Sequence, residues 1–345
     1  MTFDRRDFLN VGGIFAGAAF GGAALAGGMP SQAQAASAPV TGGRSVADFG
    51  VEPNSDKDQT AAMQNAIDEI AKSGHPVFIP GGNYAIGSIK LPNTCAIIGV
   101  LGKTTLRSGG TIFTAQNLNA IALSGLSFGG GKSIAKHPDI PRISFSGVPD
   151  RIGSWVSIQN CKFVMAAMPA ISLSHCAGLV QCASMVIGAS DYGILATDVP
   201  ALTISQCLVE GGKTAGIKAV SQKNTPENGV IITGNHVRAC KGAAIAVEGN
   251  AIVTGNQVAT SGIGLRLGGG GEGYILASNN LIRECDVGVG AAASGETIFA
   301  SLNLINAPKN GGVRALNGDK LIGPDLTQKS AEAYMNLTLG GNVVR

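Results

Sequence analysis

The chain is poor in aromatic and charged residues. Among its 345 residues, aromatic side chains make up 5% and charged side chains 14%. The net charge is +3 with no basic run, which argues against a nucleic-acid partner because such surfaces need clustered Lys and Arg. Trp155 is the single tryptophan and precedes a repeat strand, where it is a candidate core residue. Because sugar rings stack on exposed aromatic faces, this composition weakens the case for a neutral glycan ligand.

The seven cysteines show no pattern typical of a metal site. Their number is odd, and no Cys-x-x-Cys pair occurs. We therefore expect no metal and no cofactor. Most of the thiols are expected to be reduced and packed in the core, even in a compartment that permits disulfides.

No amphipathic helical pattern follows residue 75, and a short phrase recurs in its place. It consists of an apolar residue, two free positions, Asn or Cys, one free position, and then Val, Ile or Phe. From Cys207 to Asn303 the marked residues are spaced by 28, 21, 24 and 23 positions, a period typical of a solenoid. The marked residues are Cys161, Cys207, Asn235, Asn256, Asn280 and Asn303, with a last copy at Asn342.

Each repeat has a second limb of alternating apolar residues, such as Gly216-Ile217-Lys218-Ala219. Two short strands cannot bury their apolar faces alone, so they must stack on copies of themselves. We predict an all-β fold, a single-stranded right-handed parallel β-helix with coils about 4.8 Å apart. The marked Asn is expected to adopt the left-handed conformation and to bond its amide to the next coil. Cys161 and Cys207 would be small buried substitutes in this ladder.

Residues 1–35 have the features of an export signal. Two arginines precede an apolar stretch, Val11 to Ala26, and a small-x-small cleavage pattern follows. The start resembles the twin-arginine export signal, although Asp4 and Asn10 depart from its usual residues. The motif residues are Arg5, Arg6, Phe8 and Leu9, and the cleavage pair is Ala33 and Ala35.

The alternative for this segment is a retained membrane anchor. The apolar stretch is interrupted by glycines and is short for a span that needs about 20 residues. We expect cleavage, no membrane span in the mature chain, and export to the periplasm or extracellular space. The predicted organisation is a signal peptide at 1–35, a linker at 36–43, an N-terminal capping module with a helix and the first coils at 44–110, and β-helix repeats at 111–345. In the capping module, apolar residues from Ala62 to Ile70 fall at helical spacing, and this helix is expected to cover the open first coil.

The capping module carries a family resemblance. Asp48-Phe49-Gly50, the run Thr60 to Ile67, and Phe78-Ile79-Pro80-Gly81-Gly82-Asn83-Tyr84 resemble the entry segment of the pectate-lyase-like superfamily of right-handed β-helices. With the twin-arginine start and the repeats, the whole chain resembles a family of exported repeat proteins of unassigned activity. The superfamily implies action on polysaccharides by lyases with an Arg base and Asp-bound calcium, by hydrolases with paired Asp, or by epimerases with a Tyr-Gly-Ile-Asp-Pro-His-Asp motif.

None of these catalytic patterns is complete in the sequence. The epimerase motif has an echo at Tyr192 to Asp198, but Leu195 and Thr197 occupy the positions of its catalytic Asp and His, which leaves no general base. The repeats contain no Asp-Asp doublet for hydrolysis. The turn Gly268 to Gly273 supplies one carboxylate, too few for calcium.

One group of polar residues is predicted to share an outward face. Three positions after each ladder residue, successive coils hold Glu210, Arg238, Ala259, Arg283 and Asn306. Stacking would place Glu210 and Arg238 about 5 Å apart, with Arg283 about 10 Å beyond. Two arginines could bind carboxylates or sulfates of an acidic polysaccharide; the alternative is a solvated face with one weak ion pair. The candidate residues for binding an anionic glycan are Glu210, His236, Arg238, Gln257 and Arg283.

The expected function is that of an exported β-helix protein that binds an anionic polysaccharide or cell-envelope glycan. A polysaccharide lyase, hydrolase or epimerase acting along the coil face is one alternative, and a structural envelope scaffold is another. The chain ends on a repeat phrase without an evident cap. Either residues 318–338 fold back over the last coil or another copy covers it, which leaves an oligomer open.

Overall fold

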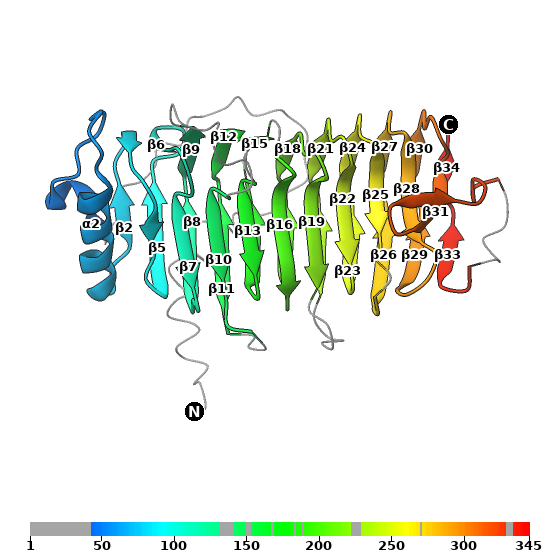
Figure 1. Cartoon of the computed structure of the whole chain (residues 1–345), viewed down its shortest axis with the longest axis horizontal. Coiled ribbons are helices and arrows are strands. Elements are labelled where there is room, and N and C mark those ends of the chain that lie inside the picture. Colours follow the sequence, from blue (N-terminus) through cyan, green and yellow to red (C-terminus); the bar gives the residue numbers. More distant parts are fainter. Residues whose placement is uncertain are drawn as a thin grey trace, which may run out of the picture. The chain divides into compact units, whose positions relative to one another are not determined.

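The strands wind into a parallel β-solenoid in which each turn adds one strand to each of three sheets (Figure 1). Within each sheet neighbouring strands pair in parallel, except for the last pair of one sheet. The fold class predicted from the repeats is therefore confirmed. The computed structural model describes residues 43–130, 141–149, 153–166, 169–182, 184–187, 190–221, 229–269, 271–328 and 334–345.

The first sheet, sheet A, holds 12 strands. They are β1 Arg44–Ser45, β2 Val77–Ile79, β5 Thr94–Gly99, β8 Ala120–Ser124, β11 Trp155–Gln159, β14 Ala177–Gln181, β17 Leu202–Ser205, β20 Val230–Thr233, β23 Ala251–Thr254, β26 Tyr274–Ser278, β29 Thr297–Ser301 and β33 Leu337–Gly340.

Sheet B follows sheet A around each coil and holds 11 strands, most of them short. They are β3 Gly82–Ala85, β6 Thr104–Ser108, β9 Leu126–Gly130, β12 Lys162–Ala166, β15 Ser184–Ile187, β18 Leu208–Glu210, β21 His236–Arg238, β24 Gln257–Ala259, β27 Leu281–Arg283, β30 Leu304–Asn306 and β34 Val343–Val344.

Sheet C completes the coil with 11 strands. They are β4 Ile89–Lys90, β7 Phe113–Gln116, β10 Ile143–Ser146, β13 Ile171–Ser174, β16 Tyr192–Val199, β19 Ala215–Ser221, β22 Ala243–Glu248, β25 Ile263–Leu267, β28 Val287–Ala292, β31 Val313–Asn317 and β32 Lys320–Ile322.

The core lies inside the coil, because alternate residues of every strand point inward. In sheet A, Ile204, Ile232 and Val253 stack in register on successive coils, and all three are fully buried. Identical stacking recurs along the three sheets, so each apolar residue packs against its equivalents in the neighbouring coils.

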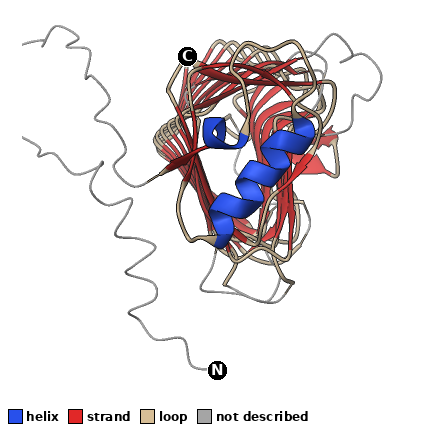
Figure 2. Cartoon of the chain, turned by 90° about the vertical axis from the view of Figure 1, so that its left-hand side faces the viewer, coloured by secondary structure: helices blue, strands red, loops and turns tan. Residues whose placement is uncertain are grey.

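Helix α2, Thr60–Lys72, lies across the open N-terminal end of the coil (Figure 2). Its apolar residues fall on one face, and Met63, Ala66, Ile67 and Ile70 are buried. A short 3₁₀ helix, η2 (Val46–Phe49), packs beside it. The helix thus covers apolar residues of the first coils, as its spacing in the sequence predicts.

An asparagine ladder runs inside the corner between sheets A and B. The side-chain amide of Asn235 donates to Asn256 Oδ1 (3.0 Å), Asn256 donates to Asn280 (3.0 Å), and Asn280 donates to Asn303 (2.9 Å). The ladder ends on Asn342, which accepts from Asn303 at 3.0 Å.

The expected left-handed conformation of the ladder asparagines is wrong. The residue before each of them has the positive φ instead, as at Gly234 (64°), Gly255 (65°) and Asn279 (56°). That residue turns the chain at the corner. The ladder Asn then directs its side chain inward, where it replaces hydrogen bonds that water would otherwise make.

Cysteines continue the ladder position toward the N-terminus. Cys161, Cys182 and Cys207 are buried, the Cys182 N–H donates to Cys207 Sγ (3.2 Å), and the Cys207 N–H donates to Asn235 Oδ1 (2.9 Å). All seven cysteines are free and buried. Burial raises the pKa of the Cys161 thiol to about 12, so this thiol stays protonated near neutral pH.

The end of the chain folds back over part of the last coils. Strand β32 pairs antiparallel with β31 and ends sheet C, while β33 and β34 end the other two sheets. Asp325 follows this hairpin, and its carboxylate accepts hydrogen bonds from the amides of Gly312 (2.8 Å), Val313 (3.2 Å) and Thr327 (3.0 Å) and from the Thr327 hydroxyl (2.7 Å). Of the two alternatives for the last coil, the fold-back is observed for sheet C.

Asp325 makes the stability of this end depend on pH. Burial raises the pKa of its carboxyl, but the four hydrogen bonds together outweigh burial and leave the pKa below its usual range. A depressed pKa means that Asp325 stabilises the fold above the unfolded value of about 3.9 and loses this effect as the pH falls through the folded value. We expect Asp325→Asn to speed amide hydrogen exchange at Gly312 and Val313 at pH 7, with a smaller difference from the unsubstituted protein at pH 3. Asp56→Asn, near the opposite end, is the control and should leave both amides unchanged.

Candidate functional site

The outer faces of the three sheets differ in charge. After β1, the strands of sheet A contain no charged residue. The strands of sheet B contain one acidic residue, Glu210, and several basic ones. The strands of sheet C carry both signs. An anionic ligand is therefore best matched by the outer face of sheet B.

The predicted ridge of polar residues lies on the outer face of sheet B. The pairing register places Arg238 between Glu210 and Ala259, and Arg283 between Ala259 and Asn306. Nε and Nη2 of Arg238 both bind Glu210 Oε2, at 3.1 and 2.7 Å. Both side chains of this pair are well exposed, so its contribution to stability is about 0–1 kcal/mol.

The same column continues to the last residue of the chain. The Arg345 N–H donates to Ile305 O (2.9 Å), and the Ala307 N–H donates to Arg345 O (2.7 Å). Because Val344 is in register with the buried Ile305, the next residue, Arg345, falls on the outer face beside Asn306. We call Arg238, Arg283 and Arg345 the arginine ridge.

His236 and Gln257 form a second column on this face. They are in register with each other on β21 and β24, two residues before Arg238 and Ala259 respectively. The structure thus brings all five candidate residues together on one outer surface. Two further basic side chains, Arg107 and Lys162, extend outward from sheet B toward the N-terminal end.

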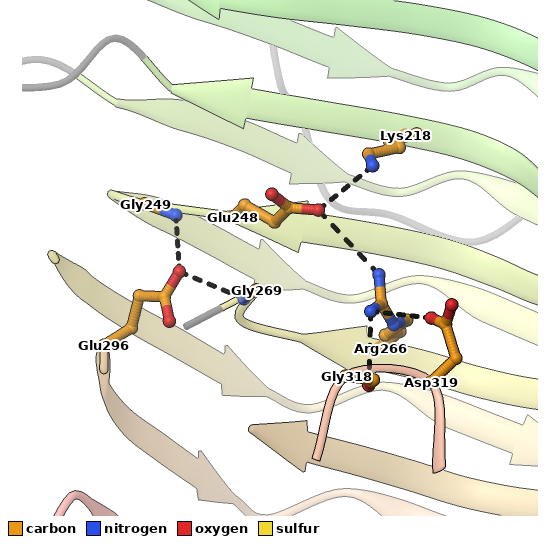
Figure 3. A network of polar contacts seen from close by, with 8 residues as sticks. All are labelled: Lys218, Glu248, Gly249, Arg266, Gly269, Glu296, Gly318 and Asp319. Atoms are coloured by element: carbon orange, nitrogen blue, oxygen red, sulfur yellow. Dashed lines mark hydrogen bonds and ion pairs between the residues drawn. The ribbon is translucent and has the colours of Figure 1, made fainter. Parts of the chain in front are cut away.

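Sheet C carries a polar network that the sequence analysis does not predict (Figure 3). Lys218 Nζ lies 3.0 Å from Glu248 Oε1, and Arg266 Nη1 lies 3.8 Å from the same oxygen. Arg266 Nη2 binds Asp319 (2.9 Å) and the Gly318 carbonyl (3.4 Å). Two cations and two carboxylates balance in charge. The contacts of Arg266 with Gly318 and Asp319 hold the β31–β32 turn against β25.

Part of this network had a signal in the sequence. Lys218, Arg266 and Arg314 occupy equivalent positions, since the register runs from Lys218 through Ala246 to Arg266 and through Gly290 to Arg314. Each follows an apolar residue in the second limb of its repeat. Asp319 had no such signal, because it belongs to a turn outside the repeat.

Glu296 is a third carboxylate, beside this network, and it is fully buried. Its Oε1 accepts from the amides of Gly249 (3.3 Å) and Gly269 (3.1 Å), which join two corners of the coil (Figure 3). A side chain at Gly269 would lie 2.6 Å from the carboxyl carbon of Glu248. Glu296 is therefore inaccessible to a polysaccharide and holds backbone in place, while Glu248 already has two cationic partners.

The remaining catalytic patterns also lack the groups that they need. The echo of the epimerase motif lies on β16, where Leu195 is in register with Lys218 and supplies no base. Among the residues that the structure describes, no group of three or more His, Cys, Asp or Glu is arranged to hold a metal ion.

Sheet A carries the exposed aromatic side chains. Trp155 is 46% exposed, Tyr274 68% and Phe299 42%, so the expectation that Trp155 is a core residue is wrong. Trp155 begins its strand with its side chain on the outer side of β11, whereas the next residue, Val156, is fully buried.

The predicted export residues lie outside the described part of the chain. Arg5, Arg6, Phe8, Leu9, Ala33 and Ala35 all precede residue 43, where the description begins. Within the residues described, no helix has the length and apolar character needed to cross a membrane.

Comparison with known proteins supports the pectate-lyase-like superfamily. Residues 43–136 match the family described as rhamnogalacturonase A/epimerase, pectate lyase-like. No curated protein matches the sequence. Similar solved structures share only 14% or 13% of their residues with this chain, so they show its fold alone.

Two solved structures share the solenoid fold. The A-module of the mannuronan C-5 epimerase AlgE6 of Azotobacter vinelandii is 14% identical, with a TM-score of 0.53 over 87% of this chain and 99% of that chain. The surface protein and adhesin PfbA of Streptococcus pneumoniae is 13% identical, with a TM-score of 0.52 over 88% of this chain and 97% of that chain. One of these is an enzyme and the other an adhesin, so the shared fold does not distinguish catalysis from binding.

Proposed function

We propose that this protein binds an anionic polysaccharide along the outer face of sheet B and does not turn it over. The observation that carries the proposal is the arginine ridge, which lies on the face whose strands contain a single acidic residue, Glu210. Guanidinium groups bind carboxylates and sulfates through two parallel hydrogen bonds. A regular row of them suits a polymer that repeats its acidic groups.

Several weak contacts in a row suffice for such binding. Arg283 is exposed and forms no ion pair among the described residues, whereas Arg238 is partly neutralised by Glu210. Each exposed charge contributes little alone, but a polymer engages several of them at once, and each further contact is effectively intramolecular.

Catalysis on sheet C is the second candidate function, favoured by the match of residues 43–136 to a family that includes epimerases. The geometry argues against it. Glu248 is held between Lys218 and Arg266, and Glu296 is buried against backbone amides. Neither carboxylate is free to transfer a proton to or from a sugar.

The proposal includes export. The twin-arginine start and cleavage pattern of residues 1–35, together with the family of exported repeat proteins that the chain resembles, support a role at the cell envelope. Such a location would bring the ridge into contact with envelope or extracellular glycans.

Binding to immobilised polygalacturonate and alginate tests the proposal. Arg283→Ala should weaken binding up to about fivefold, since an exposed charge pair contributes up to about 1 kcal/mol. Glu210→Gln should strengthen binding because it leaves the Arg238 guanidinium free for the ligand. Both effects should shrink as salt rises.

Lys72→Ala is the matched control, because Lys72 is an exposed cation on α2 at the far end of the coil. It should leave binding unchanged. Unsaturated ends, reducing ends and the C5 configuration of the uronates are followed in the same reactions, and none of them should change. Retention on neither glycan would refute the proposal, and new ends or inversion at C5 would favour the enzyme on sheet C.

A further inference from the structure

We propose that the arginine ridge selects a linear polysaccharide whose negative charges on one side recur at every second sugar, bound parallel to the axis of the coil. The inference rests on the proposed function and specifies the ligand of the same face. It follows from the spacing of the arginines rather than from their number.

The three arginines lie on alternate coils. Between Arg238 and Arg283 the register places Ala259, and between Arg283 and Arg345 it places Asn306. Neighbouring strands are about 4.8 Å apart, so the charges of the ridge repeat at about 10 Å. The intervening positions are uncharged, which makes the ridge a row of separated sites rather than a continuous basic strip.

The backbone holds this spacing firmly. In the corner three residues before the ridge positions, the ladder from Asn235 to Asn303 links each coil to the next through buried amides at 2.9–3.0 Å. Each strand of the ridge also pairs with its neighbours along sheet B. A ligand must therefore match the repeat of the protein, because the coils cannot slide to match the ligand.

A uronate chain with equatorial 1,4 linkages has the required repeat. Successive rings turn over along such a ribbon, so their carboxylates alternate between its two sides. Carboxylates on one side then recur after two rings, a length close to that of two coils. A polymer with a charge on every unit facing the protein would place alternate charges opposite Ala259 and Asn306.

The uncharged coils offer groups for the intervening sugar. Gln257 lies on the same strand as Ala259 and presents an amide, and Asn306 presents another. On the charged coil next to Gln257, His236 occupies the same column and lies on the strand of Arg238. Amide and imidazole groups both donate and accept hydrogen bonds, which suits ring hydroxyls.

A charge-conserving exchange tests the inference. The double variant Ala259→Arg with Arg283→Ala keeps the number of arginines but shortens the interval from Arg238 to the next arginine from two coils to one. For a purified β-1,4-linked oligomannuronate, we expect this variant to bind at least about fivefold more weakly than the unsubstituted protein. For inorganic polyphosphate, whose charge recurs on every unit, the two proteins should bind alike.

The single variant Ala259→Arg is a second test that does not depend on removing a side chain. A ligand with the proposed repeat has no carboxylate opposite position 259 of β24, so this variant should not bind the ligand more tightly than the unsubstituted protein. Attraction by net charge alone predicts tighter binding by this variant. Circular dichroism and thermal unfolding establish that both variants fold.

The outcomes separate this inference from the proposed function. If the exchanged variant binds the oligomannuronate as tightly as the unsubstituted protein, or if Ala259→Arg tightens binding, the periodic match is refuted while glycan binding stands. If the unsubstituted protein binds no anionic glycan, the proposed function fails and the inference fails with it.

Discussion

Replacing Asn256 by alanine is expected to lower the free energy of unfolding by about 3–5 kcal/mol. Asn256 is fully buried, and its Oδ1 accepts from both the backbone N–H and the side-chain amide of Asn235, each at 3.0 Å. Its Nδ2 donates to Ile232 O at 2.9 Å and to Asn280 Oδ1 at 3.0 Å. Alanine would leave several of these groups buried without a partner, and each such group costs about 1–3 kcal/mol.

Urea unfolding followed by circular dichroism measures this loss. The matched control is Asn306→Ala, since Asn306 is an exposed asparagine on the outer face of β30. It should change stability by less than about 0.5 kcal/mol. Equal effects of the two substitutions would show that the ladder does not stabilise the coil.

Gly178→Ala should destabilise the fold by about 3 kcal/mol or more. Gly178 lies in β14 with φ 143°, and an added Cβ would lie 1.8 Å from the carbonyl oxygen of Val156 in the preceding coil. That oxygen belongs to the backbone of β11, which is paired with β14 along its length. The clash can be relieved only by separating the two coils, so neighbouring hydrogen bonds should weaken as well.

Gly110→Ala is the control for this substitution. No atom lies within 4 Å of a Cβ at Gly110, and its φ is not in the left-handed range. Thermal unfolding should distinguish the two alanines clearly. A Gly178→Ala protein as stable as Gly110→Ala would contradict the close approach of these coils.

The ladder shows which features local spacing predicts. Asn235, Asn256 and Asn280 recur with the period of the coil, and any residues that share a phase in a solenoid must stack. The same logic predicts one column for Glu210, Arg238 and Arg283, and the pairing register confirms it. The sequence does not predict which corner residue has the positive φ, because either of two adjacent residues can supply the turn.

The network around Arg266 shows what spacing does not predict. Asp319 reaches Arg266 from an antiparallel hairpin turn, and no other repeat has such a hairpin in its described residues. Glu296 lies in a corner between sheets C and A, and its burial depends on how adjacent corners pack. Such contacts depend on connections of variable length, for which a periodic pattern carries no information.

The coil, its inward-facing residues and the column that contains the arginines can all be predicted from the sequence, because each is a property of one repeating period. Which charges of sheet C are neutralised is visible only in the folded chain, because Asp319 comes from a turn outside that period. In the folded chain, Lys218 and Arg266 of sheet C pair with Glu248 and Asp319, whereas Arg283 of sheet B stays exposed without an ion pair among the described residues.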